Sequence, residues 1–151
     1  MTTRRKIEAQ RWFQPASYDL KATRWNIQGG FYDTACFLAQ QAGEKALKSL
    51  LYFQGARRAA LMTHSLAEMI REAGKKATQM KELLDPAREL DLHYIPSRYP
   101  NGIPGGYPHE FYGQNVAEQA MASAEKILSA VQSYFLAAGE SDILGNQEEK
   151  G

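Results

Sequence analysis

The stretch that decides the fold is Phe31-Tyr-Asp-Thr-Ala-Cys-Phe-Leu-Ala-Gln-Gln-Ala-Gly-Glu-Lys-Ala-Leu-Lys-Ser-Leu-Leu-Tyr-Phe-Gln-Gly55, which contains no proline. Its apolar residues recur every three or four positions, which predicts a long helix with one broad apolar stripe. The residues expected on an opposite, exposed face are Gln41, Glu44, Lys45 and Lys48. Small residues around Gly43 leave room for a close helix approach, so we expect this helix at the centre of a bundle.

Residues 7–28 show the same spacing and predict a first helix, with Trp12 and Trp25 widening its buried side. Pro15 lacks the N–H group that a helix interior uses, so the regular helix either starts near this residue or bends there. Gly29 and Gly30 then break the pattern and return the chain, as in an antiparallel helical hairpin.

Three more helices are expected after a basic connector that follows Gly55. The first begins near His64, because Ser65-Leu66-Ala67-Glu68 fits a capping box, and it ends near residue 74. The second covers about residues 78–93 and is restarted at Asp85-Pro86, and the last runs from about 115 to 135. Prolines and glycines between 96 and 113 predict a long loop before the last helix. The expected fold class is all-α, an up-and-down bundle of about five helices.

The chain of 151 residues is long enough for one sizeable core and short for two. We expect a single helical domain over residues 1–138 and a flexible acidic tail over 139–151, where the periodicity stops. No run approaches the roughly 18 apolar residues that a membrane span requires, and no apolar leader follows the first residues. The expectation is a cytoplasmic protein without membrane contact.

Charge is distributed unevenly along the chain. Residues 1–58 contain ten lysines and arginines against four acidic residues, whereas residues 59–151 contain eight against thirteen. Such a separation suits an anionic ligand, a complementary subunit surface, or two differently charged faces in solvent. The sequence alone leaves all three open.

The segment from Tyr94 to Asn101 combines aromatic rings with the fixed cation of Arg98 on a backbone stiffened by proline. A guanidinium can hold a phosphate with two hydrogen bonds, and a ring such as that of Tyr99 can stack on a base. The alternative is that these side chains anchor the loop on the bundle. The ligand-binding candidates on the sequence are Arg98, Tyr99, Tyr94, Lys45, Lys48 and His64.

No metal or cofactor site is expected. The three histidines are scattered, and the lone Cys36 lies in an apolar helix, where a cysteine acts as a small hydrophobic side chain. The glycine pairs match neither a phosphate-binding loop nor a dinucleotide fingerprint.

Three segments together resemble a known family: Ala39 to Leu51, His64-Ser65-Leu66, and Leu90-Asp-Leu-His-Tyr-Ile-Pro-Ser-Arg-Tyr-Pro100. In this order they resemble HEPN domains, the nucleotide-binding helical bundles of higher eukaryotes and prokaryotes. The resemblance covers about residues 8–135. It implies frequent homodimerisation, a role connected with nucleotides or RNA, and frequent pairing with a minimal nucleotidyltransferase.

Many HEPN domains carry a further motif, an arginine followed after four to six residues by a histidine, which forms a metal-independent ribonuclease site. This sequence departs from that pattern, because ten residues separate Arg98 from His109. The permitted spacing occurs between Arg58 and His64 and between Arg88 and His93, both outside the loop where the motif belongs. A ribonuclease here would have to use Arg88 with His93, or Arg98 with His109 folded back towards it.

The resemblance therefore favours a non-catalytic module that binds a nucleotide or nucleic acid and acts with a nucleotidyltransferase partner, as in a toxin–antitoxin-like pair. One alternative is a metal-independent ribonuclease toxin. Another is a dimer with a purely structural role. A catalytic site of this kind needs both a histidine that exchanges a proton and a cation that stabilises the phosphorane.

Overall fold

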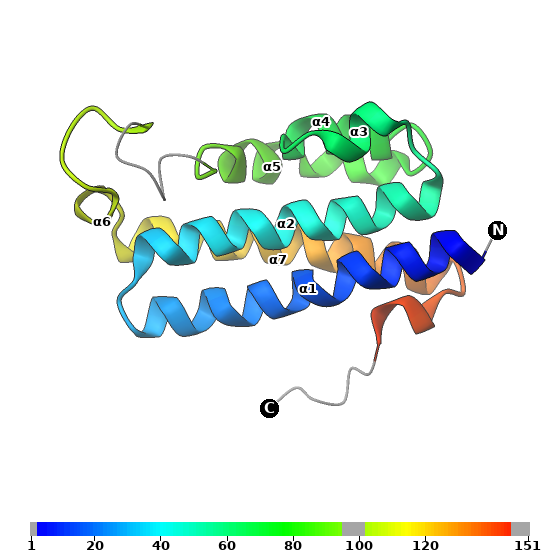
Figure 1. Cartoon of the computed structure of the whole chain (residues 1–151), viewed down its shortest axis with the longest axis horizontal. Coiled ribbons are helices and arrows are strands. Elements are labelled where there is room, and N and C mark those ends of the chain that lie inside the picture. The colour runs from blue at the N-terminus through cyan, green and yellow to red at the C-terminus, as the bar shows by residue number, and fades with distance from the viewer. Residues whose placement is uncertain (1–2, 95–101, 146–151) are drawn as a thin grey trace.

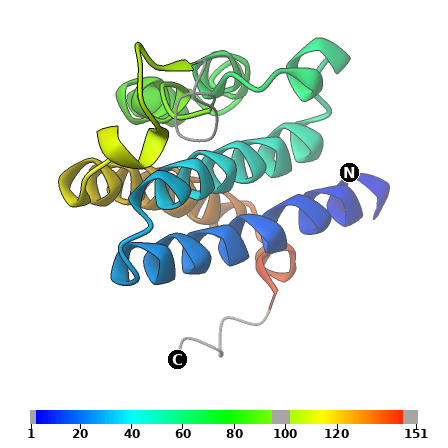
Figure 2. The same cartoon turned by 60° about the vertical axis from the view of Figure 1, so that its left-hand side comes forward.

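The computed structural model describes residues 3–94 and 102–145, and every regular element in these ranges is helical. Three long helices lie side by side, with α2 in contact with both others (Figures 1 and 2). They are α1 (Thr3–Gln28), α2 (Tyr32–Gln54) and α7 (Gln114–Ala137). The short elements are α3 (Arg58–Met62), α4 (Leu66–Ala73), the 3₁₀ helix η1 (Thr78–Leu83), α5 (Leu84–Asp91), α6 (Pro108–Phe111) and the 3₁₀ helix η3 (Ser141–Leu144). The all-α fold class is confirmed.

Helix α2 is the centre of the bundle, as its composition predicts. It packs on α1 and α7 on one side and on α4 and α5 on the other. A Cβ atom placed on Gly43 would lie 2.8 Å from Leu66 Cδ2 and 3.0 Å from Leu90 Cδ1. The missing side chain therefore lets α4 and α5 approach α2 closely.

The connection after α2 sets the position of the later elements. Gly55 ends α2 in a left-handed conformation, with φ at 68°, which glycine adopts without strain. The chain then turns back through α3 and runs along α2. His64 contacts Glu44, which lies ten residues before Gln54, the last residue of α2. At 1.5 Å per residue this return covers about 15 Å of α2.

Two expectations about α1 are settled by the structure. The helix runs through Pro15 without interruption, so Pro15 is an interior residue of α1. Trp12 is half-buried, but Trp25 is 74% exposed, so its predicted place on the buried side is wrong. Trp25 lies two residues from both Thr23 and Ile27 on the packed stripe, which places it about 200° around the helix from either.

The packed structure continues beyond residue 138, where the sequence predicts that the domain ends. Ile143 and Leu144 of η3 are buried in the same core as α1 and α7. Lys6 on α1 forms ion pairs of 2.8 Å with Glu140 and with Asp142. Residues 139–145 therefore form part of the packed structure, and residues 146–151 lie outside the described ranges.

The described part of the region between α5 and α7 contains the short helix α6. Residues 95–101 lie outside the described ranges, and the bends at 103–106 lead into α6. The long loop expected over 96–113 therefore includes a helical turn at Pro108–Phe111, where proline occupies a first-turn position that needs no N–H donor.

Candidate functional site

Three rings from different elements stack beside the middle of α2. The Tyr94 ring stands 5.0 Å from the ring of His64, and the two planes differ by 17°. On α2, Phe37 stacks on the same tyrosine at 6.4 Å and 21°. We call Phe37, Tyr94 and His64 the ring column. Because the His64 side chain is 55% exposed, the column has ring surface at which a base can stack.

Glu44 holds the histidine of the ring column in place. Its Oε1 lies 3.0 Å from His64 Nδ1, while its Oε2 accepts a hydrogen bond of 3.3 Å from Lys48 Nζ. Gln40 Nε2 donates to the same carboxylate at 3.4 Å. The Glu44 and Lys48 side chains are only 5% and 7% exposed. A buried carboxylate is tolerated because each of its oxygens has a partner.

Lys45 and Lys48 do not form the exposed cationic face that the sequence predicts. Lys48 is buried, with its ammonium 5.1 Å from the centre of the Trp12 ring, in addition to its pairing with Glu44. Lys45 is half-buried and forms a 2.6 Å ion pair with Asp19 on α1. To bind a phosphate, either lysine would first have to leave its carboxylate partner.

His64 is positioned by the start of α4. Ser65 caps this helix, since its Oγ accepts a hydrogen bond of 3.2 Å from the Glu68 N–H, as the capping box predicts. The Glu68 carboxylate accepts instead from the Thr63 hydroxyl, at 2.8 Å, and that hydroxyl in turn accepts from the Ser65 N–H at 3.1 Å. The capping box is thus closed through Thr63.

Asp91 is the residue that sequence reasoning missed. From the end of α5, its carboxylate accepts the N–H groups of Leu66 and Ala67, at 2.7 and 3.1 Å, and the Ser65 hydroxyl at 3.3 Å. The motifs around His64 and Leu90 are therefore joined by one carboxylate at a helix N-terminus. The sequence offered one signal for this role: Asp91 is an acidic residue at the C-terminal end of a helix, where the helix dipole disfavours negative charge.

The candidate catalytic residues Arg88 and His93 have different surroundings. Arg88 is exposed, with a guanidinium nitrogen 4.0 Å from Asp85 on its own helix. The His93 ring is buried and its Nδ1 lies 3.3 Å from the hydroxyl of Tyr112. Burial lowers the pKa of His93, with the nearby charge of Glu89 opposing the shift.

The remaining sequence candidates for a catalytic or binding role are His109, Arg98 and Tyr99, together with Arg58 from the second permitted spacing. His109 on α6 is exposed and stacks on Tyr107 at 5.5 Å. Arg58 is an exposed residue at the start of α3. Arg98 and Tyr99 lie outside the described residues.

Cys36 is fully buried on α2, as its apolar surroundings predict, and burial raises the pKa of its thiol to about 12. Such a thiol is not a nucleophile at neutral pH. Within the described ranges, no group of three or more histidine, cysteine or acidic side chains is placed to hold a metal ion.

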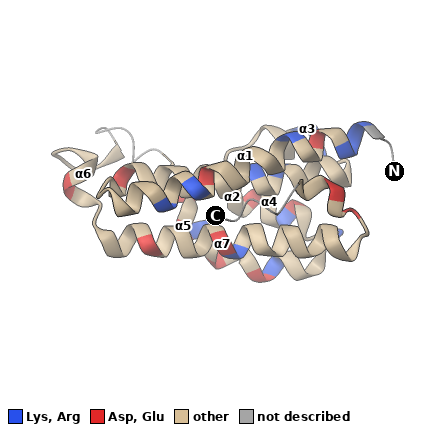
Figure 3. Cartoon of the chain, turned by 90° about the horizontal axis from the view of Figure 1, so that it is seen from below, with Lys and Arg blue, Asp and Glu red and all other residues tan. Residues whose placement is uncertain are grey.

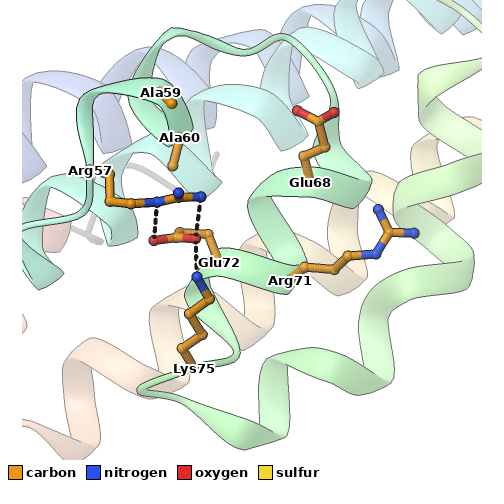
Figure 4. Close-up of a pocket in the computed structure, with 7 residues that line it drawn as sticks. All are labelled: Arg57, Ala59, Ala60, Glu68, Arg71, Glu72 and Lys75. Atoms are coloured by element: carbon orange, nitrogen blue, oxygen red, sulfur yellow. Dashed lines mark hydrogen bonds and ion pairs between the residues drawn. The ribbon is translucent and has the colours of Figure 1, made fainter.

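A pocket of about 270 Å³ lies between the connector to α3 and helix α4 (Figure 4). Glu72 occupies its centre, bound by Arg57 at 3.2 and 3.3 Å and by Lys75 at 2.9 Å. The hydrogen bonds from Lys75 and then Arg57 lower the pKa of this carboxyl. Because Arg57 and Lys75, two of the three cations in the lining, already share this carboxylate, we interpret the pocket as a clamp between the connector and α4.

A second depression, of about 620 Å³, lies where the start of α1 meets the end of α2. Its lining includes Arg4, Arg5, Glu8 and the half-buried ring of Tyr52. Cations and an aromatic ring therefore line this depression too, about 12 Å along α2 from Glu44 at 1.5 Å per residue.

None of the helices in the described part of the chain combines the length and the apolar character that crossing a bilayer needs.

The HEPN domain family model matches residues 9–134. TT1696 from Thermus thermophilus is 33% identical with a TM-score of 0.77, over 83% of this chain and 97% of that one. The archaeal HEPN homologue ST0689 is 35% identical with a TM-score of 0.70, over 84% and 97%. The HEPN domain protein tm0613 from Thermotoga maritima is 29% identical with a TM-score of 0.65, over 83% and 98%. A search of curated proteins gave no match. The chain belongs to the HEPN domain family.

Proposed function

We propose that this protein is a non-catalytic module that binds a nucleotide or nucleic acid through the ring column and the segment that follows Tyr94. The observation that carries the proposal is the stacking of Tyr94 on His64, with more than half of the His64 side chain exposed. A base adds to such rings without a need for sequence-specific hydrogen bonds. Arg98 and Tyr99 follow Tyr94 closely in the sequence and would supply the phosphate contact and a further ring.

The placement of the histidines supports binding over cleavage. His93 is buried and hydrogen-bonded to Tyr112, while Arg88 is turned to solvent beside Asp85. A general acid or base and a phosphate-binding cation need to reach the same phosphodiester. The burial of His93 and the exposure of Arg88 argue against this pair as a catalytic site.

The proposed biological setting is a homodimer that acts with a minimal nucleotidyltransferase, in a toxin–antitoxin-like pair. Family membership supports this setting. Co-expression with the nucleotidyltransferase of a neighbouring gene, followed by affinity purification and size-exclusion chromatography, tests it. A stable complex is expected, and separate elution of the two proteins would count against the partnership.

The nucleotide proposal is tested by thermal unfolding with AMP, UMP, ATP and GTP. A ligand at one hundred times its Kd stabilises the folded state by about 2.7 kcal/mol, which for a chain of this size raises Tm by roughly 5 to 10 °C. We expect such a shift for wild type and for Tyr94→Phe, which keeps the ring, and a much smaller one for Tyr94→Ala and Arg98→Ala.

Arg24→Ala is the matched control, because Arg24 is an exposed arginine on α1 whose nearest carboxylate, on Glu125, is 3.9 Å away. This variant should shift as wild type does. An unchanged Tm for wild type at saturating concentrations of all four nucleotides would remove the nucleotide form of the proposal.

A further inference from the structure

The depression at Arg4 and Arg5 holds cations that are not neutralised by a neighbour. Within the described residues, neither arginine has an acidic partner within 4 Å, and the one carboxylate of the lining, Glu8, is paired with Arg11 at 2.8 Å. In Figure 3 the start of α1 is coloured blue, the colour of lysine and arginine. This end of the molecule therefore offers positive charge to an anion.

Arg5 is held over the end of α2. A Cβ atom on Gly55 would collide with the Arg5 guanidinium, so the glycine makes room for this side chain. The last carbonyl groups of α2 favour a cation at this place. The guanidinium of Arg5 thus lies against the end of α2 although the residue is exposed, and Arg4 is exposed as well.

A continuous series of contacts joins this depression to the ring column. Tyr52, in the lining, stacks on Trp12 at 6.0 Å with planes 14° apart. Trp12 lies under the ammonium of Lys48, which is bound to Glu44, the partner of His64. We call Trp12 and Tyr52 the ring pair. Aromatic rings therefore occur at two places along one side of α2, with a lysine between them.

We propose that Arg4, Arg5 and the ring pair form a second subsite, and that this subsite and the ring column together bind one stacked single strand of nucleic acid. This inference rests on the proposed function and names its ligand class. Glu44, the partner of His64, and Tyr52 are about 12 Å apart along α2, which at about 3.4 Å per nucleotide, the rise along one strand of stacked DNA, corresponds to about four steps. A strand of about six nucleotides then reaches both subsites. A mononucleotide reaches only one.

The test is fluorescence anisotropy with 3′-fluorescein oligoadenylates of two, four, six and eight nucleotides. The affinity should rise at least tenfold from two to six nucleotides and then level off. For Arg4→Ala/Arg5→Ala, the six-nucleotide strand should bind about tenfold more weakly, while the dinucleotide binds as to wild type. The slope of log K against log salt should fall by about 1.4, since each phosphate contact on a single strand contributes about 0.7.

Arg24→Ala/Arg88→Ala removes the same charge from elsewhere on the surface and should leave the length dependence unchanged. Arg4→Lys/Arg5→Lys keeps both positive charges and should retain most of the affinity for six nucleotides. It therefore shows whether the loss in the double alanine variant comes from the missing charge. A Trp25→Phe variant leaves Trp12 as the sole tryptophan. Its fluorescence should change with the six-nucleotide strand and not with the dinucleotide.

Different results would overturn the second subsite and the proposed function. Equal affinity for two and for six nucleotides, or an equal loss in both double alanine variants, would overturn the second subsite and leave the ring column in place. Absence of binding for every length would overturn the proposed function as well.

Discussion

At the scale of single residues, Glu44 is the acceptor on which the site depends. Its carboxylate is buried and receives Lys48, Gln40 and His64. Removal of one partner of a buried ion pair leaves the other charge without compensation, which costs more than the pair itself contributes. The structural role of Glu44 and its role in orienting His64 therefore cannot be separated by one substitution.

For Glu44→Ala we expect a loss of about 3 kcal/mol in the free energy of unfolding, because Lys48 stays buried without its carboxylate. In Glu44→Leu/Lys48→Met, most of this loss should be recovered, since neither charge remains. Urea denaturation of both variants and wild type measures the difference. A double variant as unstable as Glu44→Ala would show that charge burial is not the cause.

A second prediction at the scale of single residues concerns Asp91. Asp91→Ala leaves the N–H groups of Leu66 and Ala67 without their acceptor, at a buried helix start. The expected loss is about 1 to 2 kcal/mol. Asp85→Ala, on the same helix but 96% exposed, should change stability by less than about 0.5 kcal/mol. Equal effects in urea denaturation would contradict the assigned role of Asp91.

His93 should make stability depend on pH. Burial lowers the pKa of His93 below its ordinary value of 6.5, so the unfolded chain takes up a proton at a higher pH than the folded chain does. The stabilising contribution is present above pH 6.5 and is lost as the pH falls from there through the folded-state pKa. Its slope is at most about 1.4 kcal/mol per pH unit.

Unfolding free energies measured between about pH 7.5 and 5 should therefore fall more steeply for wild type than for His93→Gln. Parallel pH profiles would show that His93 titrates alike in both states.

At the scale of elements, the close approach of α4 and α5 to α2 depends on Gly43. A Cβ atom there would press on Leu66 and Leu90, both fully buried. Alanine gains about 1 kcal/mol in helix propensity, but overpacking of a core costs about 1 to 3 kcal/mol. Whether Gly43→Ala raises or lowers the free energy of unfolding depends on which of these two contributions is larger.

We expect Gly43→Ala to destabilise the protein by about 1 kcal/mol. In Gly43→Ala/Leu90→Val, the smaller side chain makes room for the new methyl group, so the double variant should lose less stability than the two single variants lose together. Thermal and urea unfolding of wild type and the three variants completes the cycle. Strict additivity would mean that the alanine does not touch Leu90.

The helices themselves were predictable because apolar spacing and breaking residues are local signals. The hairpin at Gly29-Gly30, the end at Gly55 and the cap at Ser65 all follow from them. The burial of Lys48 was not predictable, because a helical period shows a single apolar face, whereas α2 is covered on several sides by other elements. Ring stacking of Tyr94 on His64 depends in the same way on contacts between residues distant in sequence.

The candidate site shows the same division. His64 and Tyr94 were identified from sequence by their residue types and motifs, and the structure brings them together. Asp91 was missed, because its role is to accept N–H groups from another helix. Spacing also suggested Arg88 with His93, but α5 ends at Asp91, so His93 lies in the turn beyond the helix, where its ring is buried while Arg88 is exposed.

At the scale of the whole molecule, the uneven charge of the chain becomes a spatial feature. Arg4 and Arg5 lie at the end of the bundle where α1 starts, and the clamp of Arg57 and Lys75 on Glu72 lies beside α3. The ring column lies near the middle of α2. Positive charge and stacking surface are thus arranged along one central helix, which is the basis of the proposed binding role.

The most direct test of that role is the titration of wild type with a 3′-fluorescein hexa-adenylate in EDTA, followed by gel analysis of the same samples. We expect saturable binding by wild type, at least tenfold weaker binding by Tyr94→Ala, and RNA of unchanged length. RNA that is shortened by wild type and left intact by His93→Ala would contradict it, as would the absence of binding by wild type.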